Sequence, residues 1–123
     1  MDLVADIEAM QAELAGWRRD LHAHPELGFE ENRTADFVAA KLEAFGVQVY
    51  RGIGQTGLVG VLREGNATRS IGLRADMDAL PILEQNTFEH RSTHQGTMHA
   101  CGHDGHTVML LAAAKYLAGT RDF

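Results

Sequence analysis

A short run of residues with metal-binding side chains, 98–108, stands out in this 123-residue chain. It holds the only cysteine, Cys101, and three of the seven histidines, His99, His103 and His106. A thiolate and an imidazole are common ligands of zinc and similar divalent ions, and Cys101 and His103 place two such donors close together. Two glycines in the run allow the backbone to turn both donors toward one point. The run therefore predicts a metal-binding loop, which an apolar helix with Gly119 as its stop would follow.

Asp104, which directly follows His103, has more than one interpretation. It could bind the metal or orient a ligand histidine through a hydrogen bond. It could also orient a histidine base if Cys101 were a catalytic nucleophile, but neighbouring residues rarely form that triangle. Since a divalent ion takes about four donors, Cys101 and His103 need further ligands from this chain or from another molecule.

A second acidic group, Asp76 and Asp78, ends the apolar segment 70–76, which we expect to be a third strand inside a sheet. The ends of core strands are where α/β proteins commonly place their working groups. In an extended chain these two side chains point the same way, so they could hold a metal or orient a ligand histidine. The alternative is a structural turn in which they pair with Arg74.

The remaining elements follow from apolar spacing and from glycine and proline positions. An apolar stripe with steps of three and four residues predicts a first helix that starts near residue 3 and ends near His24 and Pro25. His22 and His24 could approach a metal, but we expect them to position backbone or to cap that helix. A second helix is expected over 32–45 with Gly46 as its stop, strands over 47–50 and 57–62, and a polar surface excursion over 82–97.

Composition excludes several classes of function. The net charge of −6 and the lack of a basic stripe exclude nucleic acid as a partner. No apolar run is long enough to span a membrane. The acidic N-terminus does not resemble a secretory signal, and a single cysteine fits a reducing compartment, so we expect a cytoplasmic protein.

Three segments together carry a resemblance to a known family: Arg18–Gly28 (RRDLHAHPELG), Gly72–Pro81 (GLRADMDALP) and Met98–His106 (MHACGHDGH). They resemble successive signatures of the metal-dependent amidohydrolases, the group of hippurate hydrolase, N-acyl-amino-acid amidohydrolases and auxin-conjugate hydrolases. The resemblance runs from about residue 14 to 118 and implies an α/β fold, the N-terminal part of a zinc-peptidase-like catalytic domain with helices packed on a mixed sheet. It also implies two divalent ions, of zinc, manganese or cobalt, and an N-acyl amino acid as substrate.

The resemblance assigns roles to individual residues. It implies that Cys101 and His103 are metal ligands, with Cys101 placed to bridge both ions. Asp76 stands where other branches of the superfamily carry a ligand histidine, and Asp78 where they carry the aspartate that orients it. We therefore expect Asp76, Asp78 and Asp104 to hold the ligands in place without binding the metal.

The family's remaining ligands and its general-base glutamate are expected beyond Phe123, because no Glu-Glu pair follows Cys101 and Glu30–Glu31 lies in the first signature. Residues 1–123 would then form the N-terminal portion of the catalytic domain, without the lid and dimerisation domain. We expect such a chain to be inactive alone and to self-associate through an exposed sheet edge. The alternative is a non-catalytic metal-binding or interaction module that adds His99, His106 or another chain's donors.

Overall fold

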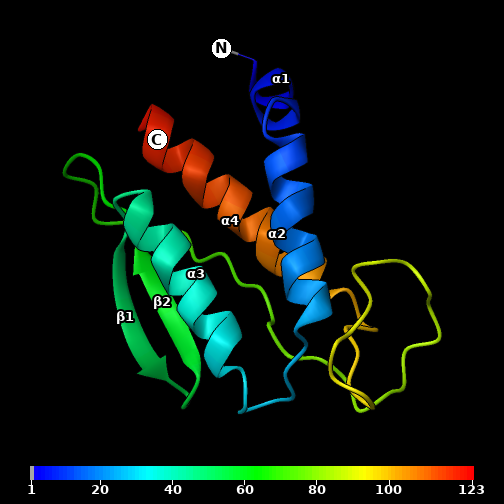
Figure 1. Cartoon of the computed structure of the whole chain (residues 1–123). Helices are drawn as coiled ribbons and strands as arrows, with labels where there is room; N and C mark the ends of the chain where they lie inside the picture. The colour runs from blue at the N-terminus through cyan, green and yellow to red at the C-terminus, as the bar shows by residue number, and fades with distance from the viewer. Residues whose placement is uncertain (1) are drawn as a thin grey trace.

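The computed structural model describes residues 2–123, in which a β-hairpin packs against α3 and the other helices lie beyond α3 (Figure 1). Helices α2 and α4 cross at the centre, and α3 packs between α4 and the hairpin. None of the helices described is long and apolar enough to cross a membrane. The elements are α1 (Leu3–Glu8), α2 (Gln11–Ala23), α3 (Asn32–Ala44), β1 (Gln48–Ile53), β2 (Gly57–Val61) and α4 (His103–Thr120).

The predicted first helix is present but divided in two, with the break at Ala9 and Met10. Its end is as predicted, because α2 stops at Ala23, two residues before Pro25. The apolar stripe is buried only in its second half: Leu21 is fully buried, whereas Leu3 is 54% exposed. The stripe therefore packs on the core through α2, and α1 extends beyond it.

The hydrophobic core lies where α2, α3 and α4 meet. Its buried members come from all three helices, and the ring of Trp17 packs edge-on against Phe37 with their centroids 6.5 Å apart. Fully burying one side chain of this size contributes about 1.5–3 kcal/mol, so this cluster fixes how the three helices cross. The buried cluster consists of Trp17, Leu21, Val38, Val108 and Leu111.

The hairpin confirms both predicted strands. β1 and β2 pair antiparallel, from Gln48 opposite Val61 to Ile53 opposite Gly57. Helix α3 ends at Ala44, close to the predicted end, and Gly46 (φ 81°) makes the left-handed stop. The α3 side of the hairpin is close-packed, because a Cβ at Gly60 would lie 2.9 Å from a methyl group of Val47.

The predicted third strand over 70–76 is wrong. No other segment of residues 2–123 pairs with it, and Ile71 and Leu73 are 89% and 60% exposed. An apolar segment becomes a strand only when a neighbour satisfies its backbone groups, and the described sheet has two strands rather than a larger mixed arrangement. The backbone does pair just beyond it, in single bridges of Ala79 with Leu27 and of Leu80 with Met98.

Candidate metal centre

The predicted metal loop leads directly into α4, as expected. Gly102 adopts a left-handed conformation (φ 83°) and precedes the first helical residue, His103. Cys101 is a free, exposed cysteine at this turn. The helix continues to Thr120, one residue past the predicted stop. The turn thus places the thiol and the imidazole at the N-terminal end of a half-buried helix.

The His103 ring is held by Asp78. Its Nδ1–H faces the Asp78 carboxylate at 2.8 Å and the Asp78 backbone carbonyl at 3.0 Å. A carboxylate on one ring nitrogen fixes the tautomer and makes the other nitrogen a better ligand, as in many metal sites. Nε2 of His103 is therefore the nitrogen available for a metal ion.

Asp76 lies on the opposite side of the same ring. Its carboxylate accepts from Arg74 at 2.5 Å and stands 3.8 Å from Nε2 of His103, which is too far for a hydrogen bond. Its backbone carbonyl accepts from the Thr107 hydroxyl at 3.0 Å, which ties this segment to α4. The two aspartates therefore do not play the same part: Asp78 orients His103, and Asp76 borders the Nε2 side.

Asp104 is buried, and its carboxylate contacts side chains of α2. Its carboxylate accepts from Arg18 at 3.1 Å and from Nδ1 of His22 at 2.9 Å. Burial alone would raise its pKa, but the hydrogen bonds from His22 and from the Gly105 amide, with the charge of Arg18, hold the pKa below its ordinary value. Asp104 is thus an ionised partner of α2. It is not available to orient a histidine base, so the hypothesis that Cys101 is a catalytic nucleophile loses its support.

Sequence reasoning did not identify His22 as a link between distant segments. Its Nε2 lies 3.1 Å from the Glu84 carboxylate, so the buried ring stands between Glu84 and Asp104. The signal available in the sequence was its spacing of four residues from Arg18, which puts both side chains on one face of a helix. His24 behaves as expected: its Nδ1–H donates to the Asp20 carbonyl at 2.8 Å, at the end of α2.

His99 is the one buried side chain with ring nitrogens that find no hydrogen-bond partner among the residues described. Its burial lowers its pKa, although the nearby carboxylate of Asp104 acts in the opposite direction. A buried imidazole whose ring nitrogens have no partner among the described residues therefore lies two residues before Cys101.

The donors fit a divalent ion in chemistry but fall short in number. An exposed thiol and an imidazole with a fixed tautomer are suitable ligands. Within residues 2–123, however, no group of three or more His, Cys, Asp or Glu side chains is placed to hold a metal ion. The structure thus shows part of a ligand set, and the roles of Cys101 and His103 as ligands stay predictions.

Known proteins are similar in sequence to most of this chain. Residues 72–123 match the family described as Peptidase family M20/M25/M40. The hippurate hydrolase of Campylobacter jejuni is 54% identical over 96% of this chain, and the N-acyl-L-amino acid amidohydrolase of Geobacillus stearothermophilus is 47% identical over 94%. The chain spans 31% of the length of each of these relatives.

Solved structures give the same result. A protein of methicillin-resistant Staphylococcus aureus superposes with a TM-score of 0.92 at 37% identity, over 98% of this chain and 32% of that one. The YxeP protein of Bacillus subtilis, described as a dinuclear metal-binding peptidase of the M20 family, gives 0.87 at 38% identity, over 94% and 33%. These neighbours confirm the α/β class. The chain is therefore similar to peptidase family M20/M25/M40 over residues 72–123, and as a whole it resembles the N-terminal part of these longer amidohydrolases.

Proposed function

We propose that this chain supplies Cys101 and His103 to the two-metal centre of an amidohydrolase that cleaves N-acyl amino acids. The observation that carries the proposal is the His103 ring, which Asp78 holds through Nδ1 while Nε2 makes no hydrogen bond within residues 2–123, two residues after an exposed thiol. The names of the relatives, hippurate hydrolase and N-acyl-L-amino acid amidohydrolase, support the substrate class.

The proposed chemistry divides between the metal and the chain. Bound divalent ions would polarise the amide carbonyl and lower the pKa of a water molecule. The chain's part is to present the donors: Asp78 sets the tautomer of His103, and the turn at Gly102 exposes Cys101. A thiolate ligand favours zinc, with manganese and cobalt as the other candidates, since availability and geometry often override intrinsic affinity.

The general base is proposed to lie outside the described residues. Glu31, the only buried member of the Glu30–Glu31 pair, accepts a hydrogen bond from the Thr56 hydroxyl and so braces the hairpin. Losing a general base costs about 10²–10⁴-fold in rate. With two donors in place of about four, residues 1–123 are proposed to bind metal weakly and to be inactive alone. The protein is proposed to act in the cytoplasm, with neither nucleic acid nor membrane as partner.

A non-catalytic metal-binding module is the second candidate. The observation that favours it is the incomplete donor set, which another chain could complete. The two functions differ in one respect: an amidohydrolase part regains hippurate hydrolysis when the missing two-thirds of a relative is added, whereas a binding module does not.

The test is metal content together with hippurate hydrolysis, on the chain and on Cys101→Ala. We expect weak metal binding that Cys101→Ala abolishes, and no turnover until the complementing part is added. Tight, stoichiometric binding that Cys101→Ala leaves unchanged would refute the ligand assignment. Turnover by the chain alone would refute the statement that the base lies elsewhere.

A further inference from the structure

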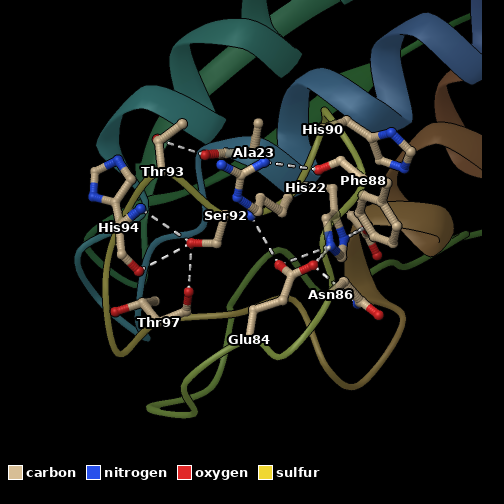
Figure 2. Close-up of polar contacts among 12 residues, drawn as sticks. His22, Ala23, Glu84, Asn86, Phe88, His90, Ser92, Thr93, His94 and Thr97 are labelled. Atoms are coloured by element: carbon tan, nitrogen blue, oxygen red, sulfur yellow. Dashed lines mark hydrogen bonds and ion pairs between the residues drawn. The ribbon is translucent and has the colours of Figure 1, made fainter.

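The loop over residues 81–98 is closed on itself although it contains no helix or strand. Its two ends are joined by paired backbone hydrogen bonds of 2.9 Å between Leu80 and Met98. Its far side is fixed to the end of α2, where the Ala23 carbonyl accepts from the amide and the hydroxyl of Thr93 at 2.9 and 2.7 Å (Figure 2). The loop is therefore a docked unit, not a free excursion.

Glu84 fills the interior of this loop. Its side chain is only 4% exposed, and its carboxylate accepts from the Ser92 amide at 2.8 Å and from the Asn86 side chain at 3.0 Å (Figure 2). Burial would raise its pKa, but these hydrogen bonds and that from His22 keep the pKa below its ordinary value. A buried, ionised carboxylate is costly unless it is partnered, so Glu84 depends on the hydrogen-bond partners around it.

His22 is one of these partners, and it has a second carboxylate on its other side. Nε2 lies 3.1 Å from Glu84, and Nδ1 lies 2.9 Å from Asp104. Ionised carboxylates only accept hydrogen bonds, so the His22 ring is the donor in these contacts. Arg18 adds a positive charge beside Asp104, at 3.1 Å from its carboxylate.

We propose that His22 is a positioning residue that couples the 81–98 loop to the first turn of α4 and so fixes the metal loop. Glu84 holds one side of the ring, and the other side holds Asp104, whose neighbour in the chain is His103. Loosening the loop at Glu84 therefore frees the turn that carries His103, although Glu84 touches neither predicted ligand. The effect on metal binding rests on the proposed function above, whereas the coupling itself does not.

The coupling is tested first without metal, by hydrogen exchange. We compare Glu84→Gln and His22→Gln with the wild type, and Thr93→Ala serves as control because it weakens the same loop without touching His22. Both Gln variants are expected to speed amide exchange at 103–106 at least several-fold, and Thr93→Ala to leave it unchanged. If Glu84→Gln changes exchange only within 84–97, the proposal is overturned.

The second readout is cobalt affinity, followed by the thiolate-to-cobalt absorption that Cys101 would give. Each Gln variant is expected to bind roughly tenfold more weakly, in line with losses at groups that orient ligands. The double variant is expected to be no weaker than either single one, since all three break the same connection. Additive losses would overturn the proposal. A wild type without this absorption would refute the proposed metal site, and hydrogen exchange would still decide the coupling.

Discussion

Asp78→Asn is the sharpest perturbation of the predicted metal centre. It keeps the size of the side chain but removes the negative charge 2.8 Å from Nδ1 of His103. Loss of a group that orients a ligand histidine typically costs 10–100-fold in metal affinity. Asp78 is 39% exposed, so solvent screens its charge, and its backbone carbonyl remains as an acceptor at 3.0 Å. We therefore expect the lower end, about tenfold, which corresponds to about 1.4 kcal/mol.

The assay is a competition titration with zinc or cobalt at fixed pH, with a thermal melt to show that the fold is retained. Asp36→Asn is the matched control, because it makes the same chemical change at an exposed carboxylate paired with Arg51 on the hairpin. That variant should bind as the wild type does. Equal metal affinities for wild type and Asp78→Asn would show that Asp78 does not set the tautomer of His103. That result would remove the main argument for His103 as a metal ligand.

Three further predictions concern stability and association. The pKa of Glu84 lies below its ordinary value of 4.5 in the folded chain, so its contribution is present above that value and is lost as the pH falls through the folded pKa. In urea titrations with a chelator, the stability gap between wild type and Glu84→Gln should hence narrow from pH 6 to pH 3, and a constant gap would contradict this. Gly60→Ala should destabilise by about 1–3 kcal/mol, because the added methyl group meets Val47 at 2.9 Å, whereas Gly72→Ala, with open space around it, should not. Sedimentation should show association that rises with concentration through the exposed segment at Ile71, and Ile71→Lys should reduce it; a monomer at all concentrations would be the contrary result.

Local patterns predicted most of the helices and the hairpin. The stripe through Trp17 and Leu21, the stop at Gly46 and the two strands of the hairpin each depend on a few residues, and each is found where expected. The break at Ala9–Met10 was not predictable, because nothing in the local sequence opposes a continuous helix there. The prediction of a strand over 70–76 was wrong for a different reason. The sequence of this segment suits a strand, but a strand also needs a pairing partner, and local sequence does not show whether one is present.

The site was predictable as a set of residues but not as a set of contacts. Chemistry singled out Cys101, His103 and Asp78, and the resemblance gave them roles. Sequence spacing could not separate Asp76 from Asp78, since the contact that distinguishes them spans 25 residues to His103. It also placed Glu84 in a polar surface stretch, where nothing local shows that its carboxylate is buried.

Helix α2 explains why the first signature carries both packing and charge. Trp17 and Leu21, four residues apart, form the stripe that faces the core. Arg18 and His22 repeat the same spacing one residue later, about 100° further round the helix, so they lie at the edge of that stripe. Side chains at such an edge are covered by whatever docks beside the core, which here is the first turn of α4. The packing of α2 and the placement of the metal loop are thus set by one helix, and a change in its crossing angle would move both together.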